Sequence, residues 1–326
     1  ASPDAPAKVP LLDRAGFDAA MNRRFTATYS TAMWLLDEHR TKDGRAVLPG
    51  TGMLEIAVQS LHNQGEIEPF EIADLTFFRA LEVDRPREVQ VTLARSDAGY
   101  EFSLRSDVML RGRKGFVLNA QAQVSMRDIA RPAPLDVAGI IARCQTGISE
   151  DANGIATGQE THLNFGPRWR VLQRLAYGQG EGIAHLSLPQ AFHADLAAGY
   201  VLHPALMDLA TGWAMGLIPG YLGRALWVPV SYGSVRVFRA LPAGIVSHVR
   251  IAPSEPGFAS FDITLATPEG EVCAEIGRFT IKRLEGGFGT QAPLLPSEVN
   301  LVETPAEGRA LNPGEERLAR NLAQGI

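Results

Sequence analysis

One pattern occurs twice in this 326-residue sequence: an apolar helical segment accompanied by several strand-like segments. In the first half, apolar residues recur at helical spacing through 50–65, and Gly65 closes the run. Alternating apolar residues predict strands at 70–83, 88–95, 100–107 and 115–126. The gaps between these strands are too short for crossover helices, so an antiparallel meander is expected.

The second half repeats this combination after a proline-rich break at 127–136. A short helix is predicted at 137–144 and a longer apolar helix at 203–221. Strands are predicted at 162–180, 182–189, 226–238, 244–252, 258–267 and 271–284. The predicted fold class is therefore α+β, with a sheet wrapped around a helix and the whole unit duplicated.

The breaks in the pattern also predict the domain organisation. We expect an N-terminal unit at 1–130 and a C-terminal unit at 131–286. A tail at 287–326, rich in Gly, Pro and Glu, resembles a linker, with one candidate short helix at 314–324. The first dozen residues, rich in Ala, Pro and Asp, are expected to form a linker or an edge segment.

Composition and charge argue against several classes of protein. Hydrophobic residues make up 45 % of the chain and charged residues 21 %, which is ordinary for a globular protein. A net charge of −5 without a basic face argues against nucleic acid as a partner. No apolar run approaches the ~20 residues that cross a bilayer, and the N-terminus does not resemble a signal peptide. Cys144 and Cys273 form no CxxC pair; a disulfide between them stays open, and the pattern fits a reducing compartment as well as any other. A cytoplasmic location is expected.

His39 is the first candidate for chemistry, because it precedes a loop that ends in Pro49-Gly50-Thr51-Gly52 and leads into the first apolar helix. A lone histidine is more often a surface residue or a satisfied core residue. Here, however, the first helix amides lack intrahelical partners, and with the helix dipole they favour a developing negative charge. Thr51 is a candidate N-cap. An imidazole, which titrates near pH ~6.5, can accept a proton in the same place, so proton abstraction next to a carbonyl is feasible.

Asp208 is the second candidate, because it is the only charged residue between Pro204 and Pro219 in an otherwise apolar helix. Carboxylates are rarely buried without a partner. One interpretation is an aspartate near the helix start that is helped by the dipole and partly hydrated. The other is an acid whose pKa is raised by desolvation, so that it can donate a proton to a departing hydroxyl.

Other motifs carry less information. The turn at 164–169, NFGPRW, is most simply structural, although its aromatic residues suit the lining of an acyl channel. His203 precedes Pro204 and is expected to hold that turn. Gly178-x-Gly180-x-Gly182 is followed by a strand pattern rather than a helix, which excludes a dinucleotide-binding loop. No histidine shows metal-ligand spacing with Cys or acidic residues, so no metal is expected.

Three motifs in one order, His39 with GRAVLPGTG, then FGPRW, then LHPALMD, resemble the dehydratase domains of modular (type I) polyketide synthases over about 10–285. The sequence departs from the family pattern in three places. Four residues rather than three separate His39 from Gly44, and Phe165 stands where tyrosine is usual. Gly212 occupies the position four residues after Asp208 where glutamine or histidine is usual.

The resemblance implies a double hotdog fold, in which two antiparallel sheets each wrap around a central helix. It implies that His39 takes the α proton of a β-hydroxyacyl thioester, while Asp208 protonates the leaving β-hydroxyl and an α,β-unsaturated thioester remains. Amides of Gly50, Thr51 and Gly52 would hold the thioester oxygen, and no cofactor is needed because the elimination involves no redox change. The implied tunnel residues are Pro49, Phe165, Gly166, Pro167, Trp169, His203 and Gly212.

The partners implied by the resemblance are an acyl carrier protein, whose phosphopantetheine bears the substrate, and neighbouring synthase domains; a homodimer is also compatible with it. The implied enzyme class is a hydro-lyase. Within the family, a variant that also closes an oxygen ring by conjugate addition or moves the double bond stays open. Two different classes stay open as well: a non-catalytic module that binds carrier protein, and a thioester hydrolase.

Overall fold

The computed structural model describes residues 4–284 and 293–302. The elements of the first half are β1 (Ala5–Val9), β2 (Leu12–Phe17), β3 (Arg23–Tyr29), α1 (Trp34–Asp37), β4 (His39–Thr41), β5 (Ala46–Val47), α2 (Gly50–His62), β6 (Phe70–Phe77), β7 (Glu82–Val83), β8 (Arg87–Ser96), β9 (Gly99–Leu110) and β10 (Arg113–Ser125). The strands β8, β9 and β10 match the predicted strands to within a few residues. The N-terminal segment forms the edge strand β1, one of the two expected forms.

The elements of the second half are α3 (Val137–Arg143), β11 (Thr146–Glu150), β12 (Leu163–Phe165), β13 (Leu172–Tyr177), β14 (Glu181–Ser187), α4 (His193–Ala197), α5 (Pro204–Gly212), β15 (Leu226–Val237), β16 (Gly244–Ala252), β17 (Phe258–Ala266), β18 (Val272–Leu284) and β19 (Val299–Leu301). Short 3₁₀ helices lie at Gly158–Thr161, Pro167–Trp169, Gln190–Phe192, Trp213–Leu217 and Pro296–Glu298. The C-terminal strands β15 to β18 confirm the prediction closely.

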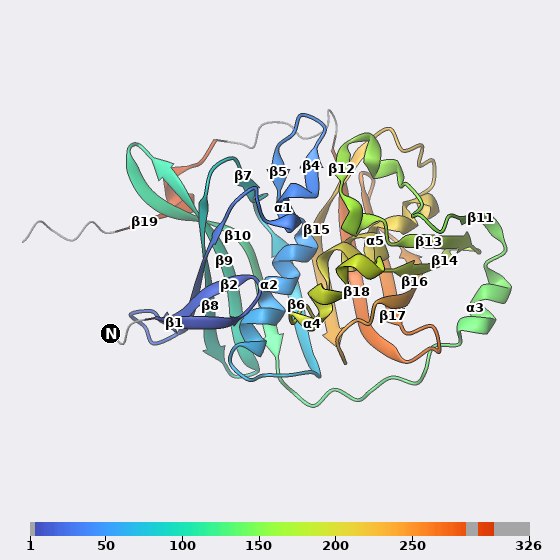
Figure 1. Ribbon diagram of the computed structural model, residues 1–326, viewed down its shortest axis with the longest axis horizontal. Helices are drawn as coiled ribbons and strands as arrows, with labels where there is room; N and C mark the ends of the chain where they lie inside the picture. The colour runs from blue at the N-terminus through green and yellow to red at the C-terminus, as the bar shows by residue number, and fades with distance from the viewer. Residues whose placement is uncertain (1–3, 285–292, 303–326) are drawn as a thin grey trace, which may run out of the picture.

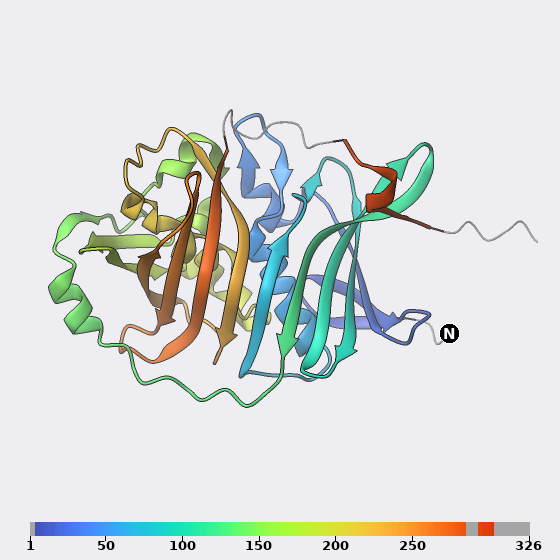
Figure 2. The same ribbon diagram turned by 180° about the vertical axis from the view of Figure 1, so that it is seen from behind.

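The sheets of the two halves are joined edge to edge. The first half has the strand order β1-β2-β3-β8-β9-β10-β6, and the second continues as β15-β18-β17-β16-β14-β13-β11. The strands β6 and β15 pair antiparallel, with Phe70 opposite Val237 and Thr76 opposite Ser231. Figure 2 shows the resulting curved surface from behind, and Figure 1 shows α2 and α5 in front of it. The two predicted sheets are therefore present and are joined through β6 and β15, and the boundary near residue 130 stays a prediction.

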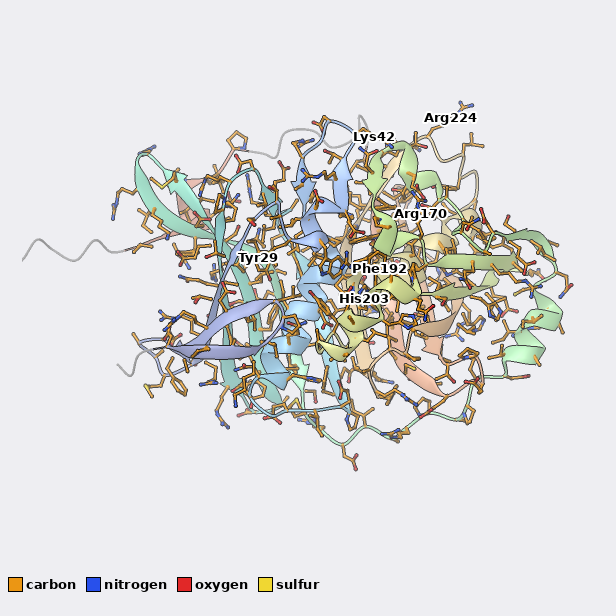
Figure 3. The ribbon with its side chains drawn as sticks, in the orientation of Figure 1. Tyr29, Lys42, Arg170, Phe192, His203 and Arg224 are labelled. Atoms are coloured by element: carbon orange, nitrogen blue, oxygen red, sulfur yellow. The ribbon has the colours of Figure 1, made fainter. Side chains whose placement is uncertain are left out.

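A second, smaller sheet connects the halves on the side of the helices. Its order is β12-β4-β5-β7, and it pairs Phe165 of the second half with His39 of the first. The side chain of Lys42, in the turn after β4, also donates to the side chain of Asn164 at 2.7 Å (Figure 3). The histidine and the aromatic turn, far apart in sequence, are thus held in fixed register.

Both long helices are buried, which explains why their sequences are apolar on nearly every side. In α2 every residue from Thr51 to Leu61 is buried. The helix ends at His62, and in the turn that follows Gly65 takes a φ of 88°, a conformation that glycine adopts without the steric cost of a side chain. The helix begins at Gly50, and its N-cap is Pro49, which makes no side-chain cap. The expectation that Thr51 caps the helix was wrong, because its hydroxyl is used elsewhere.

Three predicted elements end earlier than expected. The run 70–83 breaks after Phe77, where the chain leaves the large sheet and reaches β7 of the small one. The 203–221 helix changes to a 3₁₀ helix at Trp213, immediately after Gly212, a weak helix former. The 162–180 strand is interrupted at Pro167, which cannot donate to a strand ladder.

The structure describes only part of the predicted tail. Of the predicted linker 287–326, the structure describes 293–302, in which β19 pairs with β10 of the first half. This short segment is a strand rather than a linker. The candidate helix at 314–324 lies outside the described residues. Cys144 and Cys273 are both buried and carry free thiols, so the disulfide left open by the sequence is not formed. Among the described residues, no helix has the length and apolarity needed to span a membrane.

The two central helices meet where α2 contacts the chain just before α5. The Thr51 hydroxyl donates to the Pro204 carbonyl at 3.1 Å. One turn further, the fully buried Glu55 accepts the amides of Val201 and Leu202 at 2.9 and 2.8 Å. Burial raises the pKa of Glu55 to about 7, although the hydrogen bonds that it accepts favour the charged form. These contacts fix the start of α5 relative to α2.

Glu55→Gln should remove a pH dependence of stability. A carboxyl whose pKa is raised from 4.5 to about 7 on folding binds its proton more tightly in the folded chain. The wild-type free energy of unfolding should therefore fall as pH rises from 4.5 to 7, by up to ~3 kcal/mol. Urea unfolding at pH 5 and 7.5 should show a smaller fall in Glu55→Gln than in the wild type or in a control, Glu101→Gln, at an exposed position. Equal falls in all three would contradict the assignment.

Thr51→Val should weaken the junction without disturbing packing, since valine has the same shape but no hydroxyl. The expected loss is ~1 kcal/mol in the free energy of unfolding, the net contribution of one buried hydrogen bond. The matched change at the exposed Thr28 of β3 should leave the unfolding midpoint nearly unchanged. A Thr51→Val midpoint equal to the wild type would show that this bond does not hold the helices.

Candidate active site

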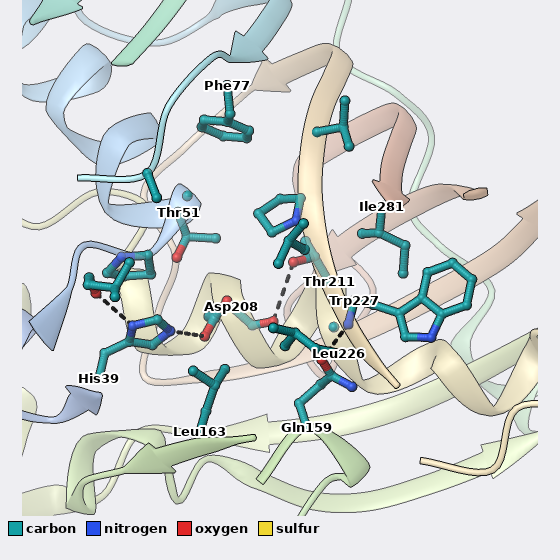
Figure 4. A pocket seen from close by; sticks show the side chains of 18 of the residues that line it. His39, Thr51, Phe77, Gln159, Leu163, Asp208, Thr211, Leu226, Trp227 and Ile281 are labelled. Atoms are coloured by element: carbon teal, nitrogen blue, oxygen red, sulfur yellow. Dashed lines mark hydrogen bonds and ion pairs between the residues drawn. The ribbon is translucent and has the colours of Figure 1, made fainter. Parts of the chain in front are cut away.

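His39 lies at the start of β4 and is almost fully buried, with 6 % of its surface exposed. Its Nδ1 lies 2.7 Å from the Val47 carbonyl oxygen. Because a carbonyl only accepts hydrogen bonds, Nδ1 carries the hydrogen, and Nε2 of the neutral ring keeps its lone pair. That nitrogen is directed toward Asp208 (Figure 4). The backbone of β5 therefore selects the tautomer in which Nε2 can accept a proton.

Asp208 lies in the second turn of α5, and its Oδ2 is 4.0 Å from His39 Nε2. This distance is too long for a direct hydrogen bond. The same oxygen accepts the indole N–H of Trp169 at 2.8 Å. The 27 % of the Asp208 side chain that is accessible lies on the wall of a cavity. Burial raises the pKa of Asp208 above its ordinary value, while His39 and the Trp169 N–H oppose this rise.

A cavity of about 530 Å³ extends from this pair between the two halves. Figure 4 shows His39 and Asp208 at one end, with Trp227 and Ile281 toward the other. Most of its wall is apolar, and it includes Pro49, Phe165 and Gly212 of the predicted tunnel residues. Such a wall suits an acyl chain. The titratable pair at this end of the cavity consists of His39 and Asp208.

The start of α2 forms another part of the wall. Gly50 and Thr51 line the cavity, and within the described part of the chain no acceptor is bonded to their amides. Free amides at a helix start are donors for an oxygen that gains negative charge. The Gly52 amide instead donates to the Pro49 carbonyl at 2.9 Å, and Gly52 does not line the cavity. The prediction that Gly52 binds the thioester oxygen therefore needs correction.

The aromatic turn at 165–169 supports the site from behind and only Phe165 lines the cavity. Gly166 is packed against Glu38, since an added Cβ would lie 2.3 Å from the Glu38 Cγ. The Glu38 carboxylate accepts the Arg168 backbone amide at 2.7 Å and its guanidinium. Gly166, Pro167 and Trp169 were predicted as tunnel residues, and the structure places all three outside the cavity wall.

His203 also lies behind the cavity rather than in its wall. Its ring is fully buried and stacks on Trp34, with ring centroids 5.2 Å apart. Its Nε2 lies 3.3 Å from the Asp195 carboxylate, which also binds Arg168. Figure 3 shows it near the centre of the molecule, close to Phe192. Its prediction as a tunnel residue does not agree with these contacts, and the expectation that His203 holds the turn before Pro204 stays a prediction.

Gln159 is a cavity residue that the sequence analysis missed. It is buried, and its side-chain oxygen accepts the Trp227 amide at 3.0 Å while its amide donates to the Tyr221 hydroxyl at 3.3 Å. A sequence signal was present, because Thr157 and Glu160 form a capping box around it. In the described ranges, no group of three His, Cys, Asp or Glu side chains is arranged to hold a metal ion.

Both halves of the chain match models of polyketide synthase domains. A model described as the polyketide synthase dehydratase domain matches residues 9–107. A model described as the polyketide synthase dehydratase N-terminal domain matches residues 132–289. The chain is 24 % identical over 301 residues to polyketide synthase PksM of Bacillus subtilis, covering 88 % of this chain and 7 % of that protein. It is 26 % identical over 301 residues to polyketide synthase GfsB of Streptomyces halstedii, covering 82 % and 5 %. The chain thus spans less than a tenth of these relatives.

Solved structures agree in fold. A trans-AT PKS dehydratase domain from Brevibacillus brevis aligns with a TM-score of 0.74 at 22 % identity, over 86 % of this chain and all of that one. The dehydratase domain of RzxB from Pseudomonas fluorescens aligns with a TM-score of 0.72 at 25 % identity, over 85 % and 99 %. The predicted double hotdog is confirmed, with its two sheets joined through β6 and β15. Since successive parts of the chain match models of one domain type, we conclude that it belongs to the dehydratase domain family of polyketide synthases.

Proposed function

We propose that this domain dehydrates a β-hydroxyacyl thioester on an acyl carrier protein and releases an α,β-unsaturated thioester. The observation that carries the proposal is the pair of His39 and Asp208, one from each half, with side chains 4.0 Å apart at one end of an apolar cavity. An elimination needs a base for one proton and an acid for the leaving oxygen, and the pair supplies both.

His39 acts as the base. Its Nε2 takes the α proton, and the electrons of that C–H bond form the new double bond through an enolate. The Val47 carbonyl holds Nδ1–H throughout and stabilises the imidazolium that forms. Geometry supports this role, since the lone pair of Nε2 is directed away from Val47 and toward Asp208.

Asp208 acts as the acid. The β-carbon–oxygen bond breaks, and the departing oxygen takes the carboxyl proton and leaves as water. Burial supports this role because it raises the pKa of Asp208 above its ordinary value, which favours the protonated form that can act as an acid. Transfer of the captured proton from His39 to Asp208 then returns both groups to their starting states.

The thioester oxygen is held by the start of α2. Negative charge develops on this oxygen as the α proton leaves. Gly50 and Thr51 line the cavity, and their amides have no other acceptor among the described residues. The positive end of the helix dipole acts in the same direction. The reaction involves no net redox change and needs no cofactor on this account.

The partners proposed are an acyl carrier protein and neighbouring synthase domains, because the curated relatives are whole polyketide synthases. A homodimer stays a prediction.

The alternatives to dehydration are ring closure, a shifted double bond, thioester hydrolysis and a non-catalytic role, and one experiment distinguishes them. Incubation with a β-hydroxyacyl carrier-protein substrate, followed by intact mass measurement, distinguishes loss of water from loss of the acyl group or no change. Chromatography separates a cyclic product or a shifted alkene from the expected one.

His39→Ala and Asp208→Asn should each lower the rate of water loss by about 100- to 10,000-fold, because each removes one proton-transfer group. Two matched controls, His193→Ala and Asp97→Asn at exposed positions, should retain the wild-type rate. The measurement is single-turnover formation of the unsaturated thioester. Near-full rates in both His39→Ala and Asp208→Asn would rule out the mechanism.

A further inference from the structure

Asp208 is oriented by a tryptophan from outside its own helix. Within the described part of the chain, the side-chain hydrogen bond that Asp208 accepts comes from the Trp169 indole N–H, at 2.8 Å from Oδ2. Its other oxygen, Oδ1, has no such partner there. An indole N–H can only donate. It therefore selects one of the two carboxyl oxygens.

Two nearby positions lack a donor. Phe165 lies next to His39, with ring centroids 5.6 Å apart, but it carries no hydroxyl. Gly212 lies one helical turn after Asp208, where i and i+4 side chains meet. An added Cβ at Gly212 would have no atom within 4 Å beyond its chain neighbours, so the space beside it is open. The indole N–H thus stands in a site where neither the turn nor the helix supplies another donor.

Trp169 is held rigidly enough to position a partner. Its ring is 2 % exposed and packs against Trp34, His39 and Phe165, with centroids 5.8, 5.7 and 5.9 Å away. The preceding residue, Arg168, binds the Glu38 carboxylate, and Glu38 immediately precedes His39 in the chain. The same ring therefore contacts His39 and hydrogen-bonds Asp208, which couples the positions of the two groups.

We infer that Trp169 is the positioning residue for Asp208, and that its N–H fixes Oδ2 as the acceptor so that Oδ1 carries the proton given to the leaving hydroxyl. The reason is that a carboxyl oxygen that already accepts an N–H is the poorer place for the acid proton. The proton then lies on Oδ1, which has no hydrogen-bond partner among the described residues. This inference rests on the proposed function for the identity of the proton acceptor, but the hydrogen bond and its effect on Asp208 do not.

The groups that face Asp208 set its titration together with Trp169. His39 on β4 and the buried Tyr232 on β15 are the titratable groups that interact with it. The Trp169 N–H favours the charged carboxylate, so its removal should raise the pKa of Asp208 further. A pH profile therefore reports on this hydrogen bond in a way that loss of packing alone would not.

Trp169→Phe keeps an aromatic ring and removes only the N–H and the second ring. With a β-hydroxyacyl thioester as substrate, kcat should fall ~10-fold or more while KM changes little, as expected for loss of a hydrogen bond to a group that acts in the transition state. The alkaline limb of the pH profile should move to higher pH. Trp213→Phe is the matched control, because its indole N–H donates to Ser247 at 3.1 Å, away from Asp208. It should leave the profile in place.

A second substitution that restores a donor distinguishes lost orientation of Asp208 from lost packing around Trp169. Gly212→Gln in the Trp169→Phe background places an amide donor one turn from Asp208, in open space. It should recover most of the lost kcat and return the alkaline limb toward its original pH. An unchanged pH profile in Trp169→Phe would overturn the inference. A fall in kcat that matches Trp213→Phe and is not rescued would overturn it too.

A direct titration keeps this test independent of the proposed function. In protein labelled with ¹³C at aspartate carboxyls, and with Asp208→Asn to assign the signal, the Asp208 resonance should titrate at higher pH in Trp169→Phe than in the wild type. If no variant or wild-type protein releases water but this shift is seen, the proposed function fails and the positioning role stands. If the wild type dehydrates its substrate but the shift is absent, the positioning role fails alone.

Discussion

The site depends on the contact between α2 and the chain that leads into α5. Thr51 and Glu55, one turn apart on α2, bind the backbone at Pro204 and at Val201–Leu202. Since Gly50 and Thr51 begin α2 and Asp208 lies just beyond Pro204, the contact that joins the halves also sets the distance between helix amides and acid. A buried carboxyl with a raised pKa is costly, which is consistent with a junction kept for position more than for stability.

The surroundings of the pair give its two members different roles. His39 is bound at Nδ1 by a backbone carbonyl, which keeps Nε2 free of hydrogen in the neutral ring. Asp208 is desolvated against an apolar cavity, which raises its pKa. The Trp169 N–H and His39 oppose this rise. Charge on Asp208 is costly in such a place, so burial favours its protonated form more than it would in an exposed carboxyl. The 4.0 Å gap leaves both groups free for a third reactant.

Two positions at which the sequence departs from the family pattern lie in the wall of the same cavity. Phe165 and Gly212 each lack a polar group, and both line the cavity near the pair. Trp169, in the turn that begins at Phe165, supplies the N–H that neither of them offers. In sequence terms this tryptophan looked like a tunnel residue, because aromatic character indicates burial but not which surface the ring covers. Its donor could be assigned only once η2, the 3₁₀ helix Pro167–Trp169, was seen packed against α5.

The sequence by itself determined the two central helices and most of the long strands, and it pointed to His39 and Asp208. Periodicity and an isolated charge in an apolar helix are local signals. It did not determine the pairing of β6 with β15 or the strand at 299–301, since alternation shows which face is apolar but not which edge meets it. The tertiary structure decided that Gly52 is bonded within its helix and that His203 lies behind the cavity. Hydrogen bonds between residues far apart in the chain, such as Thr51 with Pro204, form only after packing has brought both backbones together.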